Sequence, residues 1–320
     1  RASDISGANS NHVLFLDGST NTITTSTVIA GVTITGGQAD GGSLGADVES
    51  NWGGGLYCEA RGGECSPTLR NVVFAGNTAS KDGGALKNNA ENTAGTSSPV
   101  IVNAVFTGNT ANLGGAIHTD ADAAGGSIIS PELTNVVFAN NAADGGDGDG
   151  GAFYIDAQGG PTNNALITNV VFTGNTAADQ GGALFSAEAS PEISNSIFWD
   201  DSATNEGNEA YKVGSTVPMT FSYTIVQEGA SGIGGAGSPD FLDASGSSVT
   251  FASSTNLNAN PEFSGASTLA GPDGILATAD DSLVVTTALS PAVDAGDDAA
   301  LPADVTDLDD DGDTSEALPL

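Results

Sequence analysis

The sequence predicts an all-β fold: a right-handed parallel β-helix with three short strands in each of about 8–9 coils and an irregular C-terminal extension. The first observation is an internal repeat, in which Asn-x-x-Phe is followed by paired glycines. The second is strand-like patterning within each unit, with no sustained helical period. The third is composition: 45 of 320 residues are glycine and 6% are aromatic, which suits closely stacked backbones.

The repeat aligns on phenylalanines that follow one another at intervals of 32, 32, 34 and 26 residues, each preceded by an asparagine three positions earlier. Stacked coils lie about 4.8 Å apart, so equal positions form columns, with Phe inward and Asn at turns that tolerate left-handed backbone. A second asparagine column lies three residues after Phe and ends in Asp201. The predicted structural ladder comprises Asn71, Asn103, Asn135, Asn169, Asn195, Phe74, Phe106, Phe138, Phe172 and Phe198.

Each unit contains three candidate strands, which in the unit around Phe172 read ALITNV, VFTGN and GALFS. Branched and aromatic residues alternate there with small polar ones, as in strands. A Gly-Gly-Ala sequence follows Phe by about eleven residues in four units, and it predicts a tight corner. The last unit degenerates to NEAY at 208–211.

Segments on either side extend the pattern. HVLFLDG (12–18) and the segments after it predict earlier coils, and MTFSYTIV (219–226) predicts a later one. We therefore expect a parallel β-helix over 1–228. Residues 229–320 should form an irregular acidic region with further short strands and calcium loops.

The two cysteines, Cys58 and Cys65, lie in the glycine-containing segment CEARGGEC. We expect a disulfide between them, which implies an oxidising, extracytoplasmic setting. Two free thiols are the alternative. A metal site is less favoured because no other cysteine or nearby histidine completes a tetrahedral set.

The charge is strongly one-sided, since 40 acidic residues oppose six basic ones and give a net charge of −34. Such a surface repels nucleic acid and anionic membranes and favours hard cations such as Ca²⁺. Solubility, for example in a saline habitat, is the alternative explanation. No apolar run is long enough for a membrane-spanning helix and no signal peptide is present, so we expect a portion of a longer protein.

The repeat, FxGNxA followed by GGAL or GGAI, resembles the polymorphic outer-membrane protein repeat. The later pieces SYTIVQEG, GPDGILATADDSL, SPAVDAGD and PADVTDLDDDGDTSE resemble bacterial choice-of-anchor Q proteins. The resemblance implies a secreted or cell-surface right-handed parallel β-helix that is normally attached through a C-terminal segment. It also implies an adhesin-like or structural role.

The strongest ligand motif is DLDDDGDTSE, in which Asp307, Asp309 and Asp311 occupy positions 1, 3 and 5 of a calcium loop and Asp313 position 7. Leu318 stands where a bidentate Glu is expected, and Glu316 could substitute for it. A weaker candidate contains Asp273, Asp280 and Asp281. We predict Ca²⁺ at these sites, with a solvated acidic tail as the alternative. For DGGDGDGG (144–151), a flexible acidic loop is favoured.

A polysaccharide-active enzyme is an alternative, because parallel β-helices often act on polysaccharides. A hydrolase needs paired carboxylates and a lyase needs a base. The six basic residues form no cluster with acids at repeated positions; His118 and His12 are each expected to be surface or turn residues. In WDD (199–201), Asp201 replaces a ladder Asn, which suggests a turn role. Thr-x-Thr, typical of ice-binding faces, is not repeated in the later coils.

The sequence thus predicts a non-enzymatic protein, extracellular or on a bacterial cell surface, with an adhesin-like or structural role. Its partners would be a glycan or a protein surface, or further copies assembled laterally with calcium. Nucleic-acid binding and direct membrane insertion are not expected. The alternatives are a polysaccharide-active lyase or hydrolase and an extracellular filament subunit.

Overall fold

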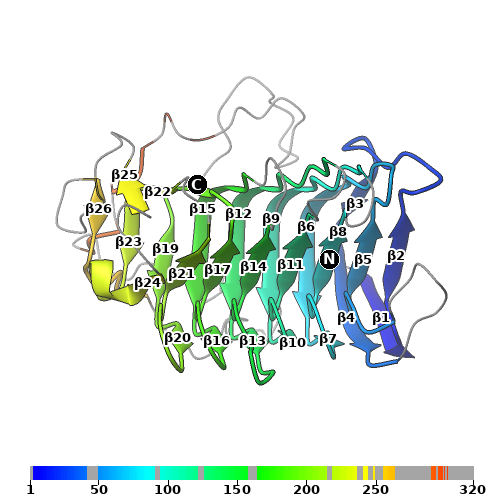
Figure 1. The fold of residues 1–320 in the computed structure, drawn as a ribbon, viewed down its shortest axis with the longest axis horizontal. Helices are drawn as coiled ribbons and strands as arrows, with labels where there is room; N and C mark the ends of the chain where they lie inside the picture. The colour runs from blue at the N-terminus through cyan, green and yellow to red at the C-terminus, as the bar shows by residue number, and fades with distance from the viewer. Residues whose placement is uncertain are drawn as a thin grey trace.

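The chain is a stack of parallel β-coils. The computed structural model describes residues 3–41, 50–90, 94–121, 126–157, 164–214, 218–235, 241–243, 248, 255–263, 290–292, 295–297, 299 and 301. Every strand pair in this part is parallel, and the strands form one sheet of 18 strands and one of 8 (Figure 1). The one helical element here is a 3₁₀ turn, η1 (Gly229–Gly232). The predicted all-β parallel β-helix is confirmed.

Each central coil contains three strands of unequal length. The first is eight residues long: β6 (Thr68–Ala75), β9 (Val100–Thr107), β12 (Glu132–Ala139) and β15 (Leu166–Thr173). The second has two residues: β7 (Thr78–Ala79), β10 (Thr110–Ala111), β13 (Ala142–Ala143), β16 (Thr176–Ala177) and β20 (Ser202–Ala203). The third forms the eight-stranded sheet: β2 (Leu14–Asp17), β5 (Leu56–Glu59), β8 (Leu86–Asn89), β11 (Ile117–Asp120), β14 (Phe153–Asp156), β17 (Leu184–Ala187), β21 (Ala210–Val213) and β24 (Ile233–Gly235).

The ends of the stack depart from this pattern. At the N-terminal end the strands are β1 (Ser3–Ser10), β3 (Val28–Ala30) and β4 (Val32–Ala39). Toward the C-terminal end they are β18 (Glu192–Ser194), β19 (Ile197–Trp199), β22 (Met219–Ser222), β23 (Thr224–Val226), β25 (Phe241–Asp243) and β26 (Asn256–Leu257). The described eight-stranded sheet thus corresponds to eight coils, within the predicted number.

Two of the three strands expected around Phe172 are one continuous strand. β15 spans both ALITNV and the start of VFTGN, and it bends at Asn169, whose φ is +61°. Asn71, Asn103, Asn135 and Asn195 also have positive φ. A single left-handed residue turns the corner without ending the ladder of hydrogen bonds, and Asn tolerates that conformation better than most residues.

The interior is built from columns. The rings of Phe74, Phe106, Phe138 and Phe172 stack with centroids 4.9 Å apart, and Phe198 follows Phe172 at 4.5 Å. All five rings are fully buried. Their spacing equals the coil-to-coil separation, so one residue type at one position fills the core throughout.

The second asparagine column is the buried one. Asn77, Asn109, Asn141 and Asn175 are all inaccessible to solvent. Each amide nitrogen donates to the side-chain oxygen of the residue one coil later, at 3.0 Å from Asn77 to Asn109 and 2.9 Å from Asn109 to Asn141. The same nitrogen also donates to a main-chain carbonyl of the preceding coil, such as Phe106 O from Asn141 at 2.9 Å. The column therefore satisfies corner groups that water cannot reach.

The paired glycines are required by two different constraints. Gly83 has φ +63°, which side chains rarely adopt. A Cβ at Gly84 would collide with the carbonyl oxygens of Gly115 and Thr110 in the next coil. The corner is thus as tight as the sequence indicates.

Strand pairing continues past the predicted boundary at residue 228. β24, β25 and β26 extend the columns begun by β21, β22 and β23. Beyond Glu262 the described residues are few, so the division into 1–228 and 229–320 stays a prediction.

Candidate functional site

The predicted calcium residues cannot be placed. Asp273, Asp280, Asp281, Asp307, Asp309, Asp311, Asp313 and Glu316 all lie outside the described residues. Within the described ranges, no group of three or more His, Cys, Asp or Glu residues is arranged to hold a metal ion. Calcium binding stays a prediction.

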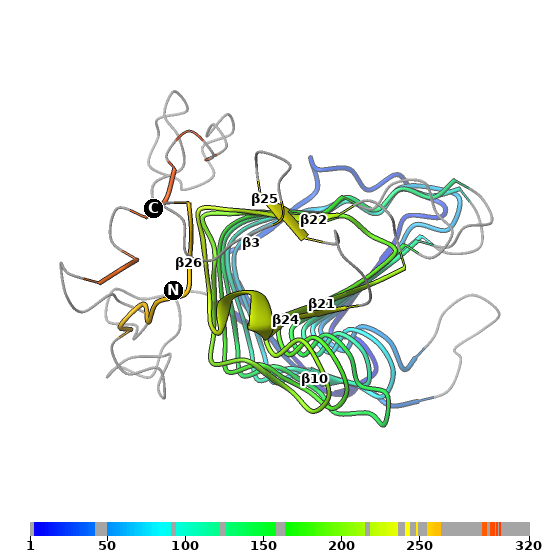
Figure 2. The ribbon, with the colours of Figure 1, turned by 60° about the vertical axis from the view of Figure 1, so that its left-hand side comes forward.

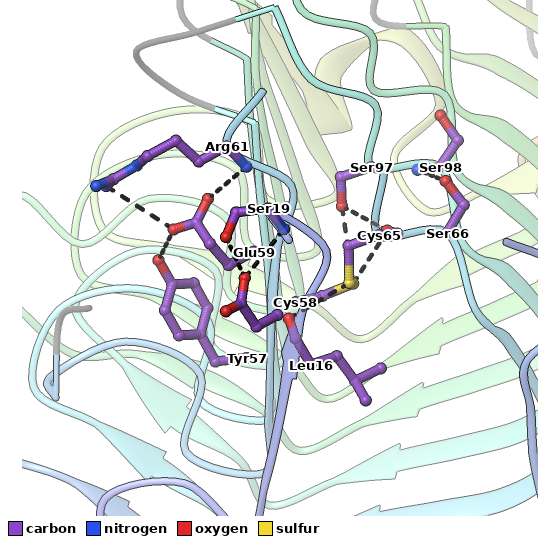
Figure 3. The surroundings of a disulfide bond; sticks show 11 residues. Leu16, Ser19, Tyr57, Cys58, Glu59, Arg61, Cys65, Ser66, Ser97 and Ser98 are labelled. Atoms are coloured by element: carbon purple, nitrogen blue, oxygen red, sulfur yellow. Dashed lines mark hydrogen bonds and ion pairs between the residues drawn. A yellow bond between two sulfur atoms is a disulfide. The ribbon is translucent and has the colours of Figure 1, made fainter. Parts of the chain in front are cut away.

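The cysteines lie inside the stack. Cys58 and Cys65 form a disulfide with an S–S distance of 2.00 Å and a Cα–Cα distance of 5.8 Å, and both are fully buried (Figure 3). Beside it, Ser97 Oγ donates to Cys65 O at 3.0 Å. The bridge closes a turn at the point where one coil passes into the next.

A second polar group lies on the outer side of β5, beyond the disulfide. The Tyr57 hydroxyl donates to Glu59 Oε2 at 2.5 Å, and Asn89 Nδ2 donates to the same oxygen at 3.1 Å. Arg61 NH2 lies 3.9 Å from it. Burial, followed by the charge of Glu59, raises the pKa of Tyr57 above its ordinary value, so this phenol remains protonated.

An acid–base cluster joins two pairs of residues, one from each of two neighbouring coils: Asp82 with Lys87, and His118 with Asp120. Lys87 Nζ lies 2.9 Å from Asp120 Oδ2, 3.0 Å from His118 Nδ1 and 3.6 Å from Asp82 Oδ2. His118 Nδ1 lies 3.5 Å from the same Asp82 oxygen. The Lys87 ammonium also stands 4.9 Å from the ring centre of Trp52, within cation–π range.

Stacking creates this cluster. β8 and β11 pair so that Lys87 faces His118, while Asp120 lies one side-chain pair further along β11. Lys87 and His118 lie on the face of the sheet that points away from the main core, because Leu86 and Ile117 alternate with them along the strands and pack inward. Asp82 comes from the turn after β7. That turn is one of a stacked row of turns, here called the lobe, which lies against the eight-stranded sheet (Figure 2).

The electrostatics favour a fixed network. Burial alone would raise the pKa of Asp82, but the charges of His118 and Lys87 outweigh it, and the pKa lies well below its ordinary value. Asp82 is therefore ionised across the physiological range. The negative charge of the two carboxylates offsets the cost of burying the ammonium of Lys87.

The cluster has the residue types of a general acid–base site but not the access. Lys87 is 0% exposed and His118 is 2% exposed. A catalytic base must come within hydrogen-bond reach of its substrate, and a polysaccharide chain cannot reach these atoms. The cluster instead links three consecutive coils, those of β5, β8 and β11, through Trp52, Lys87 and His118.

The same outer column continues as a row of rings. His118 meets Tyr154 edge-on at 4.7 Å, Tyr154 stacks on Phe185 at 4.7 Å, and Phe185 stacks on Tyr211 at 5.3 Å. The three rings after His118 are at most 7% exposed. They form a second, smaller hydrophobic core between the eight-stranded sheet and the lobe, with Leu113 packed against it.

The sequence predicts His118 to be a surface or turn residue, and this is wrong, because His118 is buried on β11 within this column. The sequence does contain the signal for the column, since Lys87, His118, Tyr154 and Phe185 each follow Gly-Gly-Ala and one apolar residue.

Asp149, from the loop expected to be acidic and flexible, lies near this column. Its side chain accepts a hydrogen bond from Gln180 N at 3.0 Å. Burial raises the pKa of Asp149 to about 7.

Near the C-terminal end, two carboxyls meet in the interior. Asp201, expected at a turn, ends the buried asparagine column and is 6% exposed; Glu209 is 1% exposed. Glu209 lies at the position held by Ala183 in the preceding coil, because Leu184 pairs with Ala210. An open, mainly polar depression of about 370 Å³ lies nearby, lined by Asn205, Glu206, Gly207, Asn208, Ser231, Ile233, Gly234 and Gly235.

Three segments of the chain, residues 71–89, 103–120 and 169–187, match the Chlamydia polymorphic membrane protein repeat. This confirms the resemblance to that repeat, and it implies a bacterial outer-membrane or surface location. Each match runs from the corner asparagine through the paired glycines to the end of a strand of the eight-stranded sheet. No curated protein and no solved structure matches the chain. No helix among the described residues is long and apolar enough to span a membrane.

Proposed function

We propose that this chain is a rod-like segment of a bacterial surface protein whose lateral faces make adhesive or structural contacts without chemical turnover. One observation carries the proposal. The residues that define the repeat, namely the Phe stack, the buried Asn column and the paired Gly, are all used inside the coils. What the repeat builds is therefore a scaffold, and contacts with other molecules fall to the outer faces and turns.

The acid–base cluster supports this choice over an enzyme. Lys87, His118, Asp82 and Asp120 form a group of acids and bases whose basic members are closed to solvent. A polysaccharide lyase or hydrolase needs such groups in an open groove.

The chemistry of the partner follows from charge. A chain with a net charge of −34 repels other anionic surfaces, so contact with acidic glycans or with further copies needs a bridging cation. Calcium fits this role because it prefers carboxylate oxygens, and DLDDDGDTSE is the segment we assign to it. If the contacts are structural and not adhesive, the same bridging would join copies of this chain side by side into filaments.

The test measures binding and turnover on the same samples. The chain is incubated with a panel of immobilised polysaccharides and matrix proteins, with Ca²⁺ or with EDTA, and bound protein is quantified. The supernatants are assayed for new reducing ends and unsaturated sugars. We expect Ca²⁺-dependent retention and no products.

Two variants sharpen the outcome. His118→Gln removes the central imidazole of the cluster, while Glu192→Gln alters an exposed residue on the opposite sheet. Sugar products that disappear in His118→Gln and persist in Glu192→Gln would make the chain an enzyme and overturn the proposal. Equal retention with Ca²⁺ and with EDTA would leave the adhesive rod as the proposed function but would show that calcium does not mediate its contacts.

A further inference from the structure

The buried pair of Asp201 and Glu209 is unlike anything in the other coils. In the four preceding coils the same two positions hold an asparagine and an alanine, such as Asn175 and Ala183, both fully buried. The coil of β19, β20 and β21 therefore places two carboxyl groups where the four coils before it have none. Two acids in one dry space cannot both ionise without a large cost.

Hydrogen bonding assigns different roles to the two groups. Asp201 Oδ1 accepts from both the main-chain N and the Nδ2 of Asn175, each at 2.7 Å. Asp201 Oδ2 and Glu209 Oε2 are buried and have no donor among the described residues. A proton on Glu209, donated to Asp201, satisfies both oxygens at once, since a neutral carboxyl supplies the missing donor.

Among the described residues, no base is found beside the pair. The other charged groups that act on it are Asp200, from the corner after β19, and Glu228, from the turn before η1, and both are acidic. The neighbouring coil on the other side contributes the neutral Asn175. Lys212 is the nearest base along β21 and is itself buried.

The pair contacts η1, the turn that leads into β24, the last described strand of the eight-stranded sheet. Glu209 N donates to Gly232 O at 2.9 Å, and a Cβ on Gly232 would stand 3.0 Å from Glu209 Cγ. Gly232 is the last residue of η1, and β24 begins at the next residue. Charge added at Glu209 therefore acts on the contact that holds η1 and β24 against β21.

We propose that Asp201 and Glu209 are held protonated as a buried pair and that loss of a proton from the pair loosens η1 and β24, so that this end of the described solenoid is closed in acid and opens as the pH rises. Opening uncovers the edge of β21, to which β24 is otherwise paired. A parallel edge is a template for strand addition, so the pair sets whether the edge of β21 or that of β24 is presented for pairing among the described strands.

The direction in pH follows from linkage. Burial, and for Glu209 also the charge of the adjoining Asp201, raises the pKa of both carboxyl groups above their ordinary values. Both exceed the unfolded values, so the folded coil holds protons that the unfolded coil releases at neutral pH. The stabilisation is complete in acid, declines as the pH rises above the unfolded values, and is lost as the pH passes through the raised pKa values.

Hydrogen exchange followed by mass spectrometry tests this on the whole chain, with rates corrected for the intrinsic effect of pH. Between about pH 5 and about pH 9, amide protection of 207–213 and 229–235 should fall at least tenfold relative to that of β9 and β12. Asp201→Asn, which extends the asparagine column, and Glu209→Gln should each abolish that relative loss. Glu192→Gln, exposed on β18, should behave as the parent chain.

Two results would overturn the proposal. One is that, in the parent chain, the protection of residues 207–213 and 229–235 relative to β9 and β12 is the same at both pH values. The other is a loss of protection that persists in both variants. Because the two variants are made separately, failure of one to fold leaves the other to decide.

Discussion

At the scale of single residues, two asparagine columns run along the rod and differ in kind. Asn135, in the outer column, bonds Asn103 and Asn169 through its side chain but is only half-buried and has φ +54°. Asn141, in the inner column, is fully buried, and its side chain bonds groups in both neighbouring coils. The outer column needs a residue that tolerates left-handed backbone, whereas the inner one needs an amide.

Replacing Asn141 by Ala should therefore lower the free energy of unfolding by about 3–5 kcal/mol, because Asn109 loses its acceptor and Phe106 O its donor. Asn135→Gly should cost at most about 1 kcal/mol, since glycine accepts positive φ. Urea unfolding of the two variants measures both values. Equal losses in the two columns would contradict the distinction.

The residue scale also shows what the sequence could predict. The spacing of Phe and Asn predicted both columns, because a column requires only that one position repeats. Glu209 escaped notice because NEAY was interpreted as a degenerate corner, whereas strand pairing places its Glu at an alanine position inside the stack. A substitution within a column carries information only once the register is known.

At the scale of elements, the sheet that contains β8 and β11 is covered on both faces. Leu86 and Ile117 pack inward, while Lys87 and His118 lie under the lobe of turns. The sequence did not predict this covering, because the lobe consists of short polar turns with no apolar period. Buried charge outside the main core is the result, and it is held by Asp82 from the lobe itself.

Lys87→Met should lower the free energy of unfolding at neutral pH by about 3–5 kcal/mol, because it leaves two carboxylates without their cation. The deficit should shrink in acid. Since the folded pKa of Asp82 lies below its unfolded value, the stabilisation is present at neutral pH and is lost as the pH falls below that unfolded value.

The matched control for that variant is Lys81→Met, which removes an exposed lysine of the same turn. Chemical unfolding across a range of pH compares the three proteins. An equal effect of both substitutions, or a deficit that grows in acid, would show that Lys87 does not hold the lobe in place.

At the scale of the whole molecule, residues 1–228 contain 24 acidic and six basic residues, so the stack carries about half of the net charge of −34 over a rod of roughly 40 Å for eight coils. Like charges at such density repel, and the repulsion opposes the compact state. Raising the salt concentration from about 0.01 M to about 1 M shortens the screening length from about 30 Å to about 3 Å.

We therefore expect the melting temperature to rise steadily with sodium chloride and to reach a similar value in other monovalent salts. Calcium at matched ionic strength separates screening from specific binding. A further rise with Ca²⁺, reversed by EDTA, is the result expected if the acidic C-terminal loops bind it. A melting temperature that falls or stays constant with salt would refute the role of repulsion.

The strict register between coils has a consequence for how such a gene can change. Phe106, Phe138 and Phe172 occupy the same position in successive coils, because the parallel strands that contain them pair residue by residue. Recombination between two repeats that adds or removes one complete unit restores all columns, whereas an event that shifts the frame by a single residue misplaces them. Rod length in this protein can thus vary in whole steps of one coil, which allows the reach of a surface protein to change without redesign of its core.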